Sequence, residues 1–123
     1  MDYRFFYNER QLPCARLSMD HEAFGLWLTD ELGADTEQLS RLLQAISSLE
    51  QGQQTEFQWQ GRDFLLRLTR DDAEVIALVL LQDHSLEELE GEDLEFYDAE
   101  SFAACGLDDF KELLSEWQEF LLD

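Results

Sequence analysis

The chain has 123 residues, 45% hydrophobic and 12% aromatic, which is enough apolar material for one folded domain over residues 1–123 and too little for two. Its formal net charge of −21 is unevenly distributed, because residues 71–123 contain 18 acidic residues and a single base, Lys111. This charge repels nucleic acid, anionic lipid and acidic proteins, so it argues against direct nucleic-acid or membrane binding and favours basic partners.

Two short segments at the N-terminus, Asp2–Tyr7 and Cys14–Met19, alternate apolar with polar residues. A period of two predicts strands with one buried face. The polar connection between them ends at Pro13, and proline is excluded from the middle of a sheet. We therefore expect an N-terminal β-hairpin.

Two segments with apolar residues at helical spacing follow the hairpin. The first runs from about Asp20 to Leu32 and ends at Gly33, and the second begins near Thr36 and ends at Gly52. The short turn between them predicts two helices packed as a hairpin.

Residues 54–81 show three strand patterns in a row, Gln54–Gln60, Phe64–Thr69 and Glu74–Leu81, separated by short polar turns. The third is apolar on both faces, which predicts an interior strand or one covered on its second side. We expect these segments to form a three-stranded antiparallel meander.

The C-terminal part begins with an acidic segment, residues 83–95, for which we expect an extended loop because like charges disfavour a helix there. A short helix is expected from Asp98 through Cys105. The final helix, Leu107–Leu122, has the strongest helical pattern of the chain, with one broad apolar face.

These elements give the order ββααβββαα. Blocks of strands separated from blocks of helices are typical of the α+β class. The sequence therefore predicts an antiparallel sheet of about five strands, made of the N-terminal hairpin and the three-strand meander, with helices packed mainly on one face.

Three segments resemble a known family: Met1-Asp2-Tyr3 with Phe5, Arg16–Trp27 and Tyr97–Phe110. The most specific motifs are Ser18-Met19-x-His21-Glu22 and Tyr97-Asp98-x-Glu100-Ser101-x-x-x-Cys105-Gly106. Together they are similar to the YacL family of small acidic gammaproteobacterial proteins, an uncharacterised family. The resemblance spans the whole chain and implies a bacterial cytoplasmic protein, and it implies no activity.

Four residues are candidates for acid–base chemistry: His21, Glu22, Glu100 and Cys105. A histidine beside carboxylates can act as a general base, and a thiol near a helix N-terminus can have a lowered pKa. The simpler interpretation is that His21 and Glu22 belong to a helix cap and that Cys105 is a small buried apolar residue. Because no complete catalytic motif is present, we expect the protein not to be an enzyme.

Metal and cofactor motifs are incomplete. A zinc-binding H-E-x-x-H motif beginning at His21 fails because position 25 is Gly25. An EF-hand beginning at Asp83 fails because Glu88 replaces the required glycine and Leu94 replaces the bidentate acid. We therefore expect no metal site and no cofactor.

The function that the charge favours is a binding module presenting an acidic surface to a basic protein, including the possibility of nucleic-acid mimicry. Asp98, Glu112, Glu116 and Glu119 form a second rank of contributors. The expected partner-binding residues are the acids of the loop: Glu87, Glu88, Glu90, Glu92, Asp93 and Glu95.

A third hypothesis is a homo-oligomeric structural protein, because the aromatic residues of the first hairpin and the last helix exceed what one small core needs. Charge repulsion opposes this, so we expect a monomer or a weak homodimer.

The two cysteines, Cys14 and Cys105, have no C-x-x-C spacing, and the first residues are not a targeting sequence. No window approaches the roughly 18 consecutive apolar residues of a membrane span. We therefore expect a cytoplasmic protein with reduced thiols.

Overall fold

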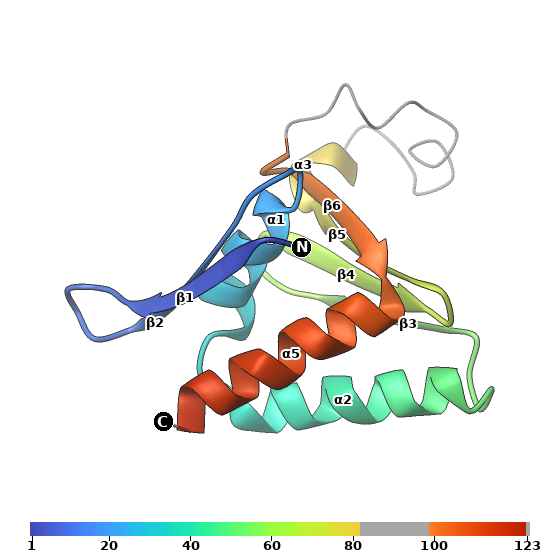
Figure 1. Ribbon diagram of the computed structural model, residues 1–123. Helices are drawn as coiled ribbons and strands as arrows, with labels where there is room; N and C mark the ends of the chain where they lie inside the picture. The colour runs from blue at the N-terminus through green and yellow to red at the C-terminus, as the bar shows by residue number, and fades with distance from the viewer. Residues whose placement is uncertain (82–98, 123) are drawn as a thin grey trace.

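Strands and helices occupy most of the chain in the computed structural model, which describes residues 1–81 and 99–122 (Figure 1). The α+β class is confirmed, with an antiparallel hairpin and a separate four-stranded antiparallel sheet. In chain order the elements are β1 (Tyr3–Tyr7), β2 (Pro13–Leu17), α1 (Glu22–Trp27), the π-helix η1 (Leu28–Leu32), α2 (Thr36–Glu50), β3 (Glu56–Gln60), β4 (Phe64–Thr69), β5 (Asp72–Ala77), α3 (Leu78–Leu81), β6 (Phe102–Gly106) and α5 (Leu107–Leu122).

The N-terminal hairpin forms as expected, but it makes its own two-stranded sheet instead of extending the larger one. The physical reason is its aromatic face, which packs on α5: the ring of Phe5 lies 5.0 Å from that of Trp117, and the ring of Tyr7 lies 4.7 Å from that of Phe120. On the other side, β2 packs against α1. A Cβ on Gly25 would lie 3.0 Å from the carbonyl oxygen of Ala15, so glycine permits this close approach.

The larger sheet has the order β3-β4-β5-β6, which makes β5 an interior strand as its two apolar faces predicted. Val75 and Ile76, on opposite faces of β5, are both buried, and they pair with Ala103 and Phe102 of β6. The helix expected through Cys105 is therefore wrong for residues 102–105, which form β6. When both faces of a strand are buried, water cannot reach its backbone N–H and C=O groups, so each edge needs a neighbouring strand as hydrogen-bond partner. This tertiary requirement overrides the local helix propensity of residues 102–105.

The third strand pattern ends earlier than expected. β5 stops at Ala77, and residues Leu78–Leu81 form the single turn α3. The backbone N–H of Ala77 still donates to the carbonyl of Ser101 at 2.8 Å, while that of Leu78 donates to Asp63. The ladder with β6 therefore ends where the chain turns away from the sheet.

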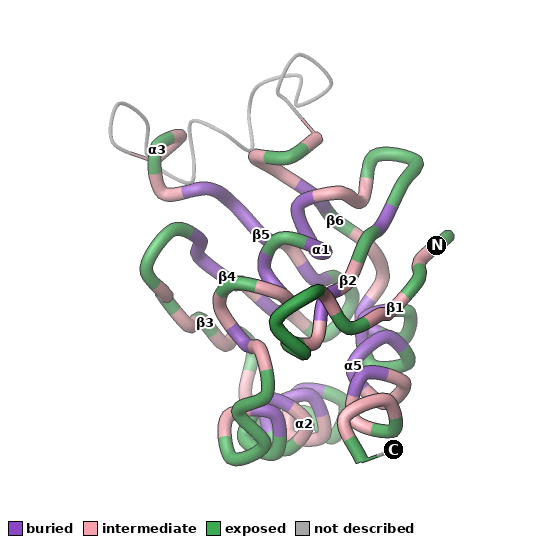
Figure 2. Tube along the Cα trace, turned by 90° about the vertical axis from the view of Figure 1, so that its left-hand side faces the viewer, coloured by how far each residue is buried: buried purple, intermediate pink, exposed green. Residues whose placement is uncertain are grey.

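The helices pack mainly on one face of this sheet, as predicted. Figure 2 shows the buried side of α2 and α5 facing inward and their exposed side facing solvent. Aromatic contacts join the layers: the ring of Phe110 in α5 lies 5.7 Å from those of both Phe24 and Trp27 in α1, and Trp27 in turn contacts Trp59 of β3 at 6.0 Å. These residues belong to one continuous hydrophobic core.

Helix boundaries follow local chemistry. Asp35 caps α2, because its Oδ1 accepts a hydrogen bond from the backbone N–H of Gln38 at 3.1 Å. Gly33 and Gly52 follow the π-helix and α2 with φ of +53° and +76°, values that glycine adopts without strain. The N-cap position of α1 is His21, which makes no side-chain cap.

Glu31 in the π-helix connects the helical layer to the sheet. Its two carboxylate oxygens accept hydrogen bonds from the backbone N–H groups of Arg62 and Asp63, at 2.9 and 2.6 Å, in the β3–β4 turn. Gly61 leaves room for this contact, because a Cβ there would lie 2.1 Å from Glu31 Oε2. The turn is therefore held in place by a residue about 30 positions earlier in the chain.

The sheet face opposite the core contains a charged cluster centred on Arg67. The Arg67 guanidinium contacts Glu56 of β3 on one side and lies 3.9 Å from Glu74 of β5 on the other. The hydrogen bond from Arg67 lowers the pKa of Glu56, whereas burial raises the pKa of Glu74. Arg67 therefore lies between two carboxylates whose pKa values are shifted in opposite directions.

Two single substitutions on this face should change stability in opposite directions. Glu56→Gln removes a carboxylate whose folded-state pKa is lowered, so we expect the free energy of unfolding at pH 7 to fall by about 0.5 kcal/mol, the size of an exposed ion pair. Glu74→Gln removes a carboxylate whose folded-state pKa is raised, so that free energy should rise by roughly a few tenths of a kcal/mol. Urea denaturation followed by tryptophan fluorescence measures both.

The pH dependence of the two stability changes tests whether the shifted pKa values of Glu56 and Glu74 cause them. The stabilisation from Glu56 is present above its ordinary pKa of 4.5 and is lost as the pH falls through its lowered folded-state pKa. The penalty for ionised Glu74 is present above its raised folded-state pKa and disappears below 4.5, so the gain from Glu74→Gln should shrink as the pH falls toward that value. If Glu74→Gln destabilised the protein at pH 7, the ion pair with Arg67 would outweigh the effect of burial.

Candidate functional site

The acids of α5 gather on one side of the helix. At 3.6 residues per turn they fall within an arc of about 100°, and the buried residues of α5 fall on a separate arc of about 120°. Along the helix axis the acids span about 17 Å, at about 1.5 Å per residue. We call these five residues the acidic ridge: Asp108, Asp109, Glu112, Glu116 and Glu119.

Two more carboxylates extend the ridge at the N-terminal end of α5. Asp71 lies in the β4–β5 turn beside the base Arg70, and Asp72 is the first residue of β5. The backbone N–H of Leu107 donates to the carbonyl of Asp71 at 3.0 Å, so this turn is joined to the start of the helix. Carboxylates are favourable there because the helix dipole places partial positive charge at its N-terminus.

Basic side chains do not neutralise the ridge. Within residues 1–81 and 99–122, no ridge carboxylate forms an ion pair. Lys111, on α5 itself, points to the other side of the helix and pairs with Glu50 of α2 at 3.1 Å. The negative charge of the ridge is therefore available to an external group.

The partner-binding residues expected from the sequence divide into two sets. Glu112, Glu116 and Glu119, which the sequence placed in a second rank, lie together on the ridge. Asp108 and Asp109 were not among the expected partner-binding residues, although helical spacing alone would have placed all five acids on one side of α5. The loop acids Glu87, Glu88, Glu90, Glu92, Asp93 and Glu95, together with Asp98 and the loop expected at residues 83–95, lie outside the described residues.

The four acid–base candidates are only partly brought together. Glu22 and Glu100 line a hollow of about 420 Å³ between the hairpin and α1, whose other lining residues include Arg16 and Cys14. In the described part of the chain the His21 side chain makes no hydrogen bond, and its ring packs on Phe24 at 6.2 Å. Among the residues that the structure describes, no histidine–carboxylate pair is therefore in place for proton transfer.

Cys105 is unsuited to act as a nucleophile. It lies in β6 and packs against the hydrophobic core. Burial raises the pKa of its thiol to about 12, and the neighbouring carboxylates of Asp109 and Asp72 add to the increase. A nucleophilic cysteine needs the opposite environment, in which positive charge lowers the pKa.

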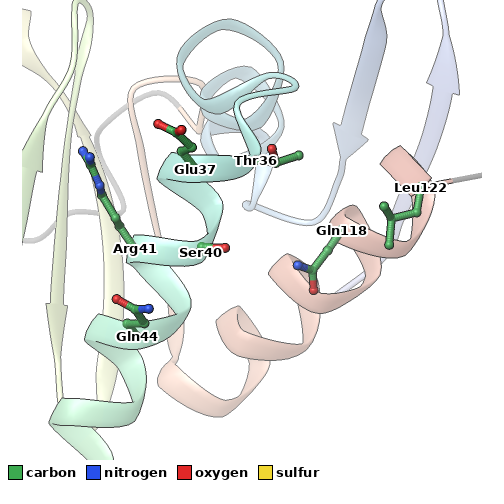
Figure 3. A pocket seen from close by; sticks show the side chains of 7 residues that line it. All are labelled: Thr36, Glu37, Ser40, Arg41, Gln44, Gln118 and Leu122. Atoms are coloured by element: carbon green, nitrogen blue, oxygen red, sulfur yellow. The ribbon is translucent and has the colours of Figure 1, made fainter.

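A polar groove of about 620 Å³ lies between α2 and α5 (Figure 3). Figure 3 shows Gln118 of α5 extending toward α2. The lining has hydroxyl, amide and charged groups but no histidine or cysteine, so it offers no activated nucleophile. The lining residues are Thr36, Glu37, Ser40, Arg41, Gln44, Gln118 and Leu122.

Metal ligands do not converge in the described residues, where no group of three or more histidine, cysteine or acidic side chains could hold an ion. Over the same residues, no helix combines the length and hydropathy needed to cross a bilayer.

Comparison with known proteins finds close relatives in bacteria. The model of an uncharacterised protein family, UPF0231, matches residues 1–121. A UPF0231 protein of Shewanella putrefaciens is 42% identical over 98% of this chain and 97% of its own length. UPF0231 proteins of Vibrio cholerae and Proteus mirabilis are 40% and 37% identical, over 98% and 100% of this chain and 95% and 97% of their own lengths. These gammaproteobacterial relatives confirm the resemblance found in the sequence, and no solved structure matches the chain.

The environment of Cys105 predicts slow thiol chemistry. At pH 8 a thiol of pKa about 12 is about one part in ten thousand thiolate, against about a quarter for an ordinary cysteine. In a Cys14→Ala variant, we expect iodoacetamide to alkylate Cys105 at least about a hundredfold more slowly in the folded protein than in urea. Asp109→Asn should accelerate the folded-state reaction, and equal rates in folded and unfolded protein would contradict this account.

The unpaired ridge also predicts that salt stabilises the fold. Raising sodium chloride from about 10 mM to about 0.1 M shortens the Debye length from about 30 to about 10 Å, which is less than the length of the ridge. We expect the melting temperature, followed by circular dichroism, to rise by several degrees. The triple variant Asp108→Asn/Glu112→Gln/Glu119→Gln should respond less to salt, whereas an unchanged response would show that the repulsion arises elsewhere.

Proposed function

We propose that this chain, which belongs to the uncharacterised protein family UPF0231, is a non-enzymatic binding module that presents an acidic surface to a basic protein partner. The observation that supports this proposal is the acidic ridge, on which five carboxylates share one side of α5 without a neutralising base among the described residues. A surface of one charge sign steers an oppositely charged partner into place and accelerates association.

The spacing of the ridge also supports nucleic-acid mimicry. Five carboxylates over about 17 Å give roughly one negative charge per 4 Å of helix axis. A DNA strand carries one phosphate per about 3.4 Å. A protein groove shaped to bind a phosphate backbone would therefore meet a similar line of charge on α5.

The acid–base candidates lack a reactive thiolate and a histidine paired with a carboxylate among the described residues, and this favours binding over catalysis. The raised pKa of Cys105 keeps its thiol protonated, and His21 has no hydrogen-bonded carboxylate among the described residues. Glu22 and Glu100 do line one hollow, but two carboxylates in one hollow do not by themselves define a reaction.

The proposal includes a cytoplasmic location, where Cys14 and Cys105 remain reduced thiols. It also favours a monomer or a weak homodimer. The hairpin aromatics Tyr3, Phe5 and Tyr7 have intramolecular ring partners, so less apolar surface remains for assembly than composition suggested. The net charge of −21 adds repulsion between copies.

A direct test is the binding of a dye-labelled octalysine peptide, measured by fluorescence anisotropy at low and at physiological salt. We expect binding that persists at about 0.15 M salt and a loss of at least about tenfold in affinity for Asp108→Asn/Glu112→Gln/Glu119→Gln, because three of the five ridge charges are removed.

The matched control is Glu9→Gln/Asp30→Asn/Glu37→Gln, which removes the same charge from exposed positions away from the ridge. It should lower the affinity only slightly. If both triple variants lost affinity equally, net charge and not the ridge would determine binding. If the unmodified protein bound neither this peptide nor octaarginine at physiological salt, the proposed function would be wrong.

A further inference from the structure

A hollow of about 300 Å³ lies where β1 meets the C-terminal half of α5, and its lining combines aromatic rings with carboxylates. Tyr3, Phe5 and Phe120 supply the rings, and Glu116 and Glu119 of the acidic ridge supply the carboxylates. We call these five residues the aromatic hollow. Its volume is at the low end of the range of about 300–1,000 Å³ for small-ligand pockets, which suits a single side chain better than a cofactor.

The rings of the aromatic hollow are held by the core beneath them. Phe5 stacks on Tyr3 at 5.3 Å, lies 5.6 Å from Phe120, and meets the fully buried Trp117 edge-on at 5.0 Å. Phe120 in turn stacks on Trp117 at 5.6 Å. Rings fixed in this way lose little conformational freedom when a ligand binds, so the surface is preorganised.

The two carboxylates occupy neighbouring positions on the same helix face, three residues apart. Glu116 Oε2 is shielded from water and has no hydrogen-bond partner in the described part of the chain. An acceptor in that position is unfavourable unless a donor reaches it. No base among the described residues lines the aromatic hollow, so a donor from a bound ligand would supply the partner that this carboxylate lacks.

We propose that the aromatic hollow binds an arginine side chain of the basic partner, an inference that rests on the proposed function. A guanidinium is planar, stacks on aromatic faces and donates hydrogen bonds in a fork that suits carboxylates. A lysine ammonium is a compact and strongly hydrated charge that uses such a site less well. The ridge attracts any basic surface, and the aromatic hollow adds a preference for arginine.

The test compares dye-labelled octaarginine and octalysine peptides by fluorescence anisotropy at about 0.15 M salt. We expect the protein to bind octaarginine about tenfold more tightly than octalysine. The double variant Glu116→Gln/Glu119→Gln should lose most of this preference. The matched control, Asp108→Asn/Glu112→Gln, removes two charges from the other end of the same ridge, so it should weaken both peptides alike and keep the preference.

A second variant tests the rings without changing the charge. Phe120→Leu keeps both carboxylates and removes one aromatic face, so it should reduce octaarginine affinity while leaving octalysine affinity nearly unchanged. Thermal unfolding verifies that each variant is folded, and Glu116→Gln/Glu119→Gln relieves repulsion and should be at least as stable as the unmodified protein.

The outcomes separate the two proposals. If both double variants reduced octaarginine affinity equally and left the preference unchanged, the aromatic hollow would not be an arginine site, whereas the acidic ridge would still be the binding surface. Equal affinity of the unmodified protein for the two peptides would likewise overturn the arginine site alone. Binding of neither peptide would overturn both proposals.

Discussion

The buried indole of Trp117 determines how α5 is rotated about its axis, and the position of every α5 carboxylate follows from that rotation. Its N–H donates to the carbonyl of Gly33 at 2.9 Å, and its ring contacts Phe5 of the hairpin. A buried indole N–H requires an acceptor, so this rotation of α5 is strongly preferred over rotations that would move the N–H away from the Gly33 carbonyl. With Trp117 pointing inward, the five acids on the other arc of the helix form one ridge, four of them exposed and the fifth, Glu116, half-buried.

The ridge opposes folding through repulsion, and the core offsets that repulsion. The energetic cost of this repulsion is reduced at the start of α5, where the helix dipole favours Asp108 and Asp109. Toward the other end, Glu116 and Glu119 belong both to the ridge and to the aromatic hollow. Long-range attraction and short-range recognition are therefore located on the same helix, so a basic partner drawn to the ridge would arrive next to the site that distinguishes arginine from lysine.

Most elements could be predicted because their signals are local. The period of two in β3 and β4, the capping by Asp35 and the positive φ of Gly33 depend on residues a few positions apart. β6 could not be predicted in this way. The two apolar faces of β5 indicated an interior strand and so implied a neighbour on each edge, but nothing in residues 102–106 alone shows that they supply it.

The sequence by itself determined the amphipathic pattern of α5 and the concentration of acid in the second half of the chain, because helical periodicity and charge are properties of neighbouring residues. Only the tertiary structure decided which aromatic residues stand beside those acids. Tyr3 and Phe5 lie more than 110 positions before Glu116 and Glu119, and they meet because the hairpin packs its aromatic face on α5 instead of joining the larger sheet. Whether the hairpin packs on α5 or extends the larger sheet depends on the packing of several elements at once, which no local sequence pattern encodes.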